Sequence, residues 1–222
     1  MRRTTCLLLL LLLLVSLATA HPTSIALFNG KNLKGWEARI WDGKKGGWDT
    51  ITPAGKVWSV KDGVLICAGR PTGYLRTTKE YENYTLELEW RWPKGSKGGN
   101  SGVLLHATKE NALGQWPQSI ESQLYRGNAG DFWAIGTTIE VPDMEKRKKG
   151  RRHINLTDDS EKPIGEWNKM KVICVGDRIR VDVNGVTVNA ASKCSQQKGR
   201  ICLQAEGHEI HFRKVILKPI RH

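Results

Sequence analysis

The side chains best suited to chemistry gather in two short segments, residues 101–106 and 119–125. Both are predicted to be neighbouring β-strands, in which successive side chains point to opposite faces. One polar face is then expected to gather a carboxylate, amides, an imidazole and a phenol, from Asn100, His106, Glu121, Gln123 and Tyr125. A sheet face that is rich in hydrogen-bonding groups and has no run of charges suits a sugar ligand. The alternative is a solvated outer face.

The rest of the chain predicts many more strands that would position this face. Residues 84–92 alternate strictly, and Asp62-Gly63 and Asn184-Gly185 are typical of tight hairpin turns, which require positive φ. Further strands are expected at residues 57–60, 64–67, 169–175, 178–184, 186–189, 200–205 and 210–217. No segment has the periodicity of a long amphipathic helix. The sequence therefore predicts an all-β fold, a sandwich or jelly roll.

The nine tryptophans are more than a core of this size requires. Trp58, Trp90 and Trp167 lie in predicted strands and are expected to be core residues. Five others lie in Gly- and Pro-rich segments predicted to be loops: Trp36, Trp41, Trp48, Trp116 and Trp133. A single tryptophan in a loop more often packs that loop against the core than binds a ligand. At least one of the five is nevertheless expected to stack on a sugar.

The first 20 residues have the pattern of a signal peptide. Arg2 and Arg3 precede a run of leucines, and Ala18-Thr19-Ala20 supplies the small residues that a signal peptidase recognises. The apolar run is too short for a comfortable membrane span. We therefore expect a secreted or periplasmic protein that is cleaved after Ala20 and has no transmembrane segment. Residues 21–222 are long enough for a single domain.

Positive charge is concentrated in the segment Lys146–Arg152, which has six cations in seven positions. The formal net charge is +13, and it falls to +11 without the two arginines of the signal peptide. In a secreted protein such a cluster is not expected to bind nucleic acid. Two interpretations remain, a solvated loop and a patch that attracts anionic polysaccharide.

Four cysteines follow the expected cleavage site, Cys67, Cys174, Cys194 and Cys202. An oxidising compartment permits up to two disulfides, in three possible connectivities. The apolar runs around Cys174 and Cys202 make buried free thiols equally compatible with the sequence. The sequence has no C-x-x-C motif and no His pair with the spacing of a metal site, so no cofactor is predicted.

An ordered series of motifs spans nearly all of the mature chain. The motifs are LFNGKNLKGW (27–36), VWSVKDGVL (57–65), GGNSG (98–102), ESQL (121–124), KPIGEWN (162–168), VNGV (183–186), GRICLQAEG (199–207) and HFRKVILKP (211–219). Together they resemble the 3-keto-disaccharide hydrolase-like family, also described as 3-keto-glucoside 1,2-lyases and hydratases. The resemblance implies a concanavalin A-like jelly-roll β-sandwich. It also implies an oxidised di- or oligosaccharide as substrate.

The chemistry implied by the resemblance starts from a ketone at C3, which acidifies the hydrogen on C2. A base removes that hydrogen, the enolate expels the glycosidic oxygen from C1, and water later adds back. The resemblance indicates Glu121 as the base, and His106 as an acid or as the group that holds the ketone oxygen. The residues expected to bind substrate are Arg91, Asn100, Gln123, Tyr125, Trp133 and Gln204. A divalent metal could replace the enolate stabiliser, but the sequence shows no convincing ligand set.

Two other functions fit parts of the sequence. A retaining glucanase of the same architecture would carry acids that alternate along one strand, which Glu87 and Glu89 imitate. Arg91 stands where a third acid would be. A non-catalytic carbohydrate-binding module would keep the stacking rings and the polar patch, yet could lose Glu121 without losing its ligand.

Overall fold

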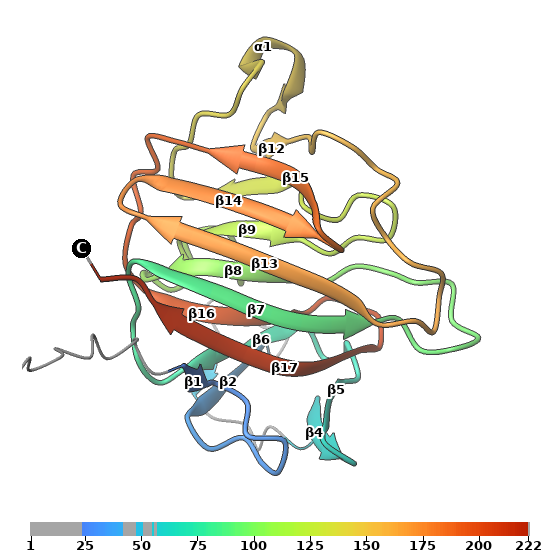
Figure 1. Ribbon diagram of the computed structural model, residues 1–222. Coiled ribbons are helices and arrows are strands. Elements are labelled where there is room, and N and C mark those ends of the chain that lie inside the picture. The colour runs from blue at the N-terminus through green and yellow to red at the C-terminus, as the bar shows by residue number, and fades with distance from the viewer. Residues whose placement is uncertain (1–23, 42–47, 51–54, 56, 222) are drawn as a thin grey trace, which may run out of the picture.

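The computed structural model describes residues 24–41, 48–50, 55 and 57–221. Two antiparallel β-sheets lie face to face, and one short helix, α1 (Met144–Arg147), projects beyond one end of the sandwich (Figure 1). The predicted all-β sandwich is thus confirmed. The predicted signal peptide lies outside the described residues. Within the described ranges, no helix has the length and apolar character needed to cross a membrane.

The first sheet has eight strands. Across the sheet they follow the order β15 (Val186–Ala191), β14 (Arg178–Val183), β13 (Asn168–Val175), β7 (Tyr84–Arg91), β17 (Ile210–Pro219), β5 (Val64–Cys67) and β4 (Trp58–Lys61), and β1 (Ile25–Ala26) pairs with β17. Both predicted hairpins form, between β4 and β5 and between β14 and β15. All four of their turn residues have positive φ, as Asp-Gly and Asn-Gly turns require.

The second sheet has nine strands and carries the candidate site. Their order is β11 (Lys148–Lys149), β12 (Arg152–His153), β10 (Phe132–Ile135), β9 (Ser119–Gln123), β8 (Gly102–Ala107), β16 (Arg200–Ala205), β6 (Gly73–Thr77), β2 (Trp36–Trp41) and β3 (Trp48–Thr50). Ile120, Leu124, Val103 and Leu105 are fully buried between the sheets. Because side chains alternate along a strand, Leu104 of β8 and Glu121 and Gln123 of β9 face outward.

The four cysteines of residues 57–221 are all buried free thiols, which decides between the two alternatives left by the sequence. Burial raises the pKa of Cys67, Cys174 and Cys194 to about 12. These thiols are therefore protonated at neutral pH and behave as small apolar core residues.

Two of the three tryptophans expected in the core are there, and one is not. Trp58 and Trp90 are almost completely buried. Trp167 precedes β13 and is only half-buried, with the guanidinium carbons of Arg91 and Arg213 lying 4.6 and 4.1 Å from its ring centroid. The prediction for Trp167 is wrong because its ring packs against two cations instead of the core.

Candidate functional site

The outer face of the second sheet carries two adjoining cavities, of about 340 and 200 Å³, which share Asn100, Gln123 and Trp133. We call the two cavities together the groove. The larger is also lined by Tyr125, Asn128, Asp131 and Arg152, and the smaller by Leu113, Trp116, Glu121, Ile135, Arg151 and Glu206. Convergent amides and carboxyls beside aromatic rings are the composition expected of a sugar site.

Strand alternation directs the polar side chains of β9 into the groove. Ile120 and Leu124 face the core, so Glu121 and Gln123 face the other way, as the sequence predicts. Trp133 is the direct partner of Glu121 across β9 and β10. Directly opposed residues in neighbouring strands are close neighbours on one face of a sheet. A carboxyl and an indole ring therefore lie side by side in the groove.

Glu121 is a buried carboxyl that is only 5% exposed, and its Oε1 has no hydrogen-bond partner among the described residues. Burial raises its pKa well above the ordinary value of 4.5, and the nearby Glu206 raises it further. Gln204 is itself fully buried, and neither atom of its amide has a partner within the described part of the chain.

Gly102 provides the space in which these two side chains meet. A Cβ added there would lie 2.4 Å from Oε1 of Glu121 and 2.5 Å from Oε1 of Gln204. Unpaired buried polar groups are costly, and they are commonly satisfied by a ligand or water. The pair therefore presents a carboxyl oxygen and an amide that are both available to a bound molecule.

Two further amides line the groove from its rim. Gln123 uses its Oε1 to accept hydrogen bonds from the backbone N–H groups of Leu124 (2.9 Å) and Tyr125 (3.0 Å), which leaves its Nε2 as the donor for a ligand. Asn100 donates its backbone N–H to Nδ1 of His208 (3.2 Å), while its Oδ1 has no partner among the described residues. Tyr125 is 48% exposed at the edge of the larger cavity.

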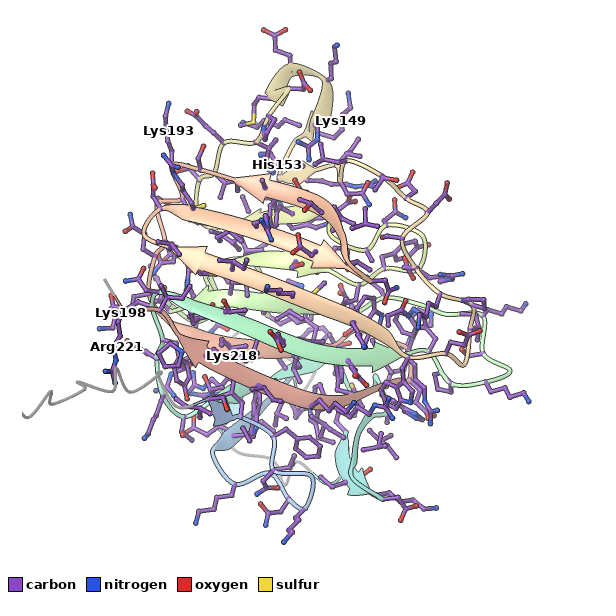
Figure 2. The ribbon with its side chains drawn as sticks, viewed as in Figure 1. Lys149, His153, Lys193, Lys198, Lys218 and Arg221 are labelled. Carbon is purple, nitrogen blue, oxygen red and sulfur yellow. The ribbon has the colours of Figure 1, made fainter. Side chains whose placement is uncertain are left out.

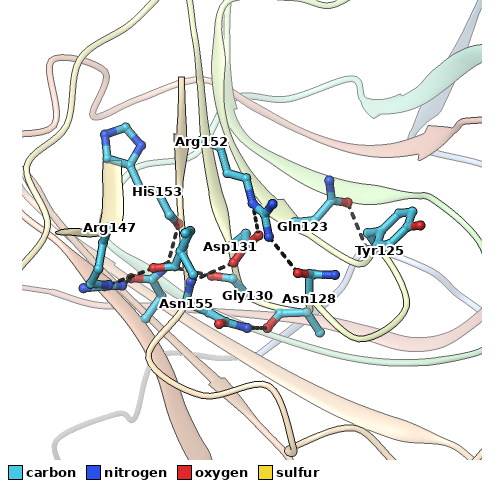
Figure 3. A network of polar contacts seen from close by, with 12 residues as sticks. Gln123, Tyr125, Asn128, Gly130, Asp131, Arg147, Arg152, His153 and Asn155 are labelled. Atoms are coloured by element: carbon cyan, nitrogen blue, oxygen red, sulfur yellow. Dashed lines mark hydrogen bonds and ion pairs between the residues drawn. The ribbon is translucent and has the colours of Figure 1, made fainter. Parts of the chain in front are cut away.

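An ion-paired network forms the opposite wall (Figure 3). Arg152 donates from Nε to Oδ2 of Asp131 (2.6 Å) and from Nη2 to Oδ1 of Asn128 (2.6 Å). The other oxygen of Asp131 accepts the backbone N–H of Asn155 (2.7 Å). Sequence reasoning missed this wall because it depends on the pairing of β10 with β12, and no local pattern indicates that pairing.

A loop between β8 and β9 closes one side of the groove. Trp116 and Leu113 pack on the apolar part of the outer face, which is formed by Tyr74, Leu104, Ala107, Ile135 and Cys202. Glu110 holds the loop through ion pairs with Arg39 (2.5 Å) and Arg76 (2.6 Å). Trp116 thereby becomes a wall of the smaller cavity instead of a plug in the main core.

Comparison with known families identifies the family of this chain. The profile of the 3-keto-alpha-glucoside-1,2-lyase-like domain matches residues 23–218. The chain belongs to this family. One curated relative, the 3-keto-disaccharide hydrolase of Bacteroides thetaiotaomicron, is 26% identical over 164 residues, which are 67% of this chain and 51% of the relative. The chain thus spans about half the length of the curated relative that it matches.

Solved structures show the same fold. A Parabacteroides distasonis protein provisionally described as a glycosyl hydrolase matches with a TM-score of 0.63 and 22% identity, over 89% of this chain and 94% of that one. The carbohydrate-binding module CBM66 of Bacillus subtilis matches with a TM-score of 0.58 and 11% identity, over 83% and 95%. The predicted concanavalin A-like sandwich is confirmed.

His106 does not lie where the sequence predicts. Between the pairs Ala107–Arg200 and Leu104–Cys202, β8 has one more residue than β16, and His106 has a φ of +53°. Such a bulge turns a side chain to the other face. The imidazole packs edge-on against Tyr84, with ring centroids 5.5 Å apart. Burial lowers its pKa to about 4, so it is a neutral core residue and does not reach the groove.

Arg91 is also absent from the groove, because it belongs to β7 of the other sheet. Its Nε donates to Nδ1 of His211 (3.3 Å). The two acids that imitate a glucanase motif, Glu87 and Glu89, lie in the same strand, and Glu89 pairs with Arg213 (2.5 Å) and Lys214 (3.0 Å). A hollow of about 450 Å³ beside them is larger than either cavity of the groove, but its acids are neutralised by neighbouring cations.

Most of the five tryptophans predicted to lie in loops belong to strands. Trp133 lies in β10 and lines both cavities, while Trp36 and Trp41 lie in β2. The side chain of Trp48 lies outside the described part of the structure. The expectation that one of the five faces a ligand therefore rests on Trp116 and Trp133. No cluster of three or more His, Cys, Asp or Glu side chains that could hold a metal occurs in the described ranges.

The basic segment is only partly a solvated patch. Residues 144–152, which we call the basic arm, project from the end of the sandwich (Figures 1 and 2). Lys146, Lys148, Lys149 and Arg151 are exposed. Arg147 is buried and donates to the backbone oxygens of Pro142 and Ile154 and to Oδ1 of Asn189; Arg152 pairs with Asp131. Only four of the six cations are thus exposed, because Arg147 and Arg152 anchor the arm.

Proposed function

We propose that this protein cleaves 3-keto-glycosides, by removing the C2 proton, eliminating the glycosidic oxygen and then hydrating the product. The observation that carries the proposal is Glu121, a buried carboxyl in a groove of amides and indole rings, whose Oε1 has no hydrogen-bond partner among the described residues. Family membership supports the substrate class. The reaction as a whole amounts to hydrolysis of the glycosidic bond.

Glu121 suits the role of base because of its surroundings. A carboxylate that has lost its water shell is a stronger base, as its raised pKa indicates. The proton that it removes lies next to a ketone, so negative charge develops on the ketone oxygen. The side-chain amide of Gln204, next to Glu121 and without a partner in the described structure, can donate to that oxygen.

The other groove residues suit the binding of a pyranose ring. Trp133 offers an aromatic face beside Glu121, which can pack on the apolar side of the sugar. The Nε2 of Gln123, the amide of Asn100 and the hydroxyl of Tyr125 can hydrogen-bond its hydroxyl groups. The same set would serve a binding module, so cleavage of substrate is the property that separates the two functions.

A second proposal concerns the basic arm, which we infer to hold the protein on anionic polysaccharide. Its lysines are exposed, and Arg151 of the same arm lines the smaller cavity of the groove. Replacing Lys146, Lys148 and Lys149 with Ser should abolish retention on heparin resin at low salt and leave the melting temperature unchanged. The matched control replaces Lys31, Lys34 and Lys61, which are equally exposed and carry the same charge.

Equal loss of retention in both triple variants would show that only net charge matters and would contradict the proposal.

Arg147→Gln should leave retention on heparin resin largely intact and lower the stability of the fold. It leaves buried acceptors unpaired and should cost about 2 kcal/mol of stability, measured by denaturant unfolding.

A further inference from the structure

Elimination of a sugar alcohol needs a proton donor for the departing oxygen, and His106 is turned away from the groove. We propose that Glu206 is this donor: its carboxyl protonates the glycosidic oxygen as the bond to C1 breaks. The proposal rests on the proposed function of the groove and adds a second catalytic residue to it.

The fold places Glu206 on the same wall as the proposed base. It follows β16 directly, two residues after Gln204, so strand alternation turns both side chains toward the groove. Glu206 lines the smaller cavity together with Glu121, Trp116 and Arg151. A base and an acid in one cavity can act on the two neighbouring carbons of a single sugar ring.

The loop that carries Glu206 is fixed from two sides. Gly207 donates its N–H to the carbonyl oxygen of Gly69 (2.8 Å), and a Cβ on Gly69 would lie 2.3 Å from the backbone of His208. A Cβ on Gly99 would lie 2.1 Å from the His208 ring. The adjoining Asn100 bonds to the same ring (3.2 Å). Such close packing holds a catalytic group in one position.

The ionisations of Glu121 and Glu206 are coupled. Burial raises the pKa of Glu206 to about 7, and Glu206 is the neighbour that most raises the pKa of Glu121. Two carboxyls in one cavity resist being ionised together. The reaction requires the form in which Glu121 is ionised and Glu206 protonated; the reverse form, with the proton on the more deeply buried Glu121, is unreactive.

The protons balance over the full reaction. Glu121 takes the C2 proton, and the electron pair forms the C3 enolate. When the enolate collapses, the C1–C2 double bond forms, the C1–O bond breaks, and the oxygen takes the proton of Glu206. In the hydration half, Glu206, now a carboxylate, removes a proton from the water that attacks C1, and Glu121 returns its proton to C2. Both carboxyls are then restored.

The test compares leaving groups. Glu206→Gln should lower the cleavage of a 3-keto-disaccharide about a hundredfold or more, because a sugar alkoxide leaves poorly without a proton. A 3-keto-glucoside of 4-nitrophenol needs no acid and should lose less than about fivefold. In heavy water, Glu206→Gln should still exchange the C2 hydrogen of the disaccharide, whereas Glu121→Gln should not. Glu209→Gln, on an exposed neighbour, is the matched control.

Equal losses on both substrates, or no loss on either, would overturn the assignment of Glu206. Loss of C2 exchange in Glu206→Gln would overturn it as well, because a leaving-group acid is not needed for that step. A wild-type protein that cleaves neither substrate would instead refute the proposed function. Melting curves of all variants establish that each is folded.

Discussion

Glu121→Gln is expected to lower the turnover of a 3-keto-glycoside by a factor of roughly a hundred or more, the scale on which loss of a general base acts. The substitution keeps the shape of the side chain and one oxygen, but removes the basicity. Substrate affinity should change little, because Trp133 and Gln123 remain. Initial rates and a binding isotherm measure the two effects separately.

The same substitution should not destabilise the fold. Glu121 is a buried carboxyl whose ionised form is disfavoured by burial and by Glu206, and an amide carries neither penalty. We therefore expect an unchanged or higher melting temperature. Glu140→Gln, which alters a half-exposed surface carboxyl paired with Lys193, is the control and should keep full activity. Wild-type turnover by Glu121→Gln would show that another group is the base.

Gly102→Ala is expected to reduce kcat/KM about tenfold to a hundredfold, since displacement of a catalytic group by about 1 Å has effects of that size. The new methyl group would lie 2.4 Å from Oε1 and 2.9 Å from Cγ of Glu121, so the carboxyl must move. The backbone itself permits alanine, because Gly102 is not among the glycines with positive φ.

The control for this prediction is Gly55→Ala, where an added Cβ meets no described residue within 4 Å. It should leave both stability and activity unchanged. Gly102→Ala should cost about 1–3 kcal/mol of stability through overpacking, measured by denaturant unfolding. Full activity of Gly102→Ala, with the protein folded, would show that the position of Glu121 is not critical.

Much of the fold could be predicted because its signals are local. Alternating side chains marked β7, and the dipeptides Asp62-Gly63 and Asn184-Gly185 marked two hairpins that the structure contains. Alternation also placed Glu121 and Gln123 on one face, because β9 has no irregularity between them.

The rest of the site depends on non-local pairing. A single extra residue in β8 reverses the direction of His106, and a bulge of this kind leaves no clear trace in the sequence. Arg91 was misplaced because alternation specifies a face of a strand but not the sheet to which the strand belongs. Alternation with Gln204 could have predicted the face on which Glu206 lies. Its closeness to Glu121 could not be predicted, because it depends on the strand order β9, β8, β16.

The most direct test of the central claim is aglycone release from a 3-keto-glucoside, measured in parallel with the unoxidised glucoside. Release is expected from the keto substrate alone, because only its C2 hydrogen is acidic, and the rate should fall when that hydrogen is replaced by deuterium. Binding of both sugars without release from either would make the groove a carbohydrate-binding site. Release from the unoxidised glucoside, or no effect of deuterium, would contradict proton abstraction by Glu121.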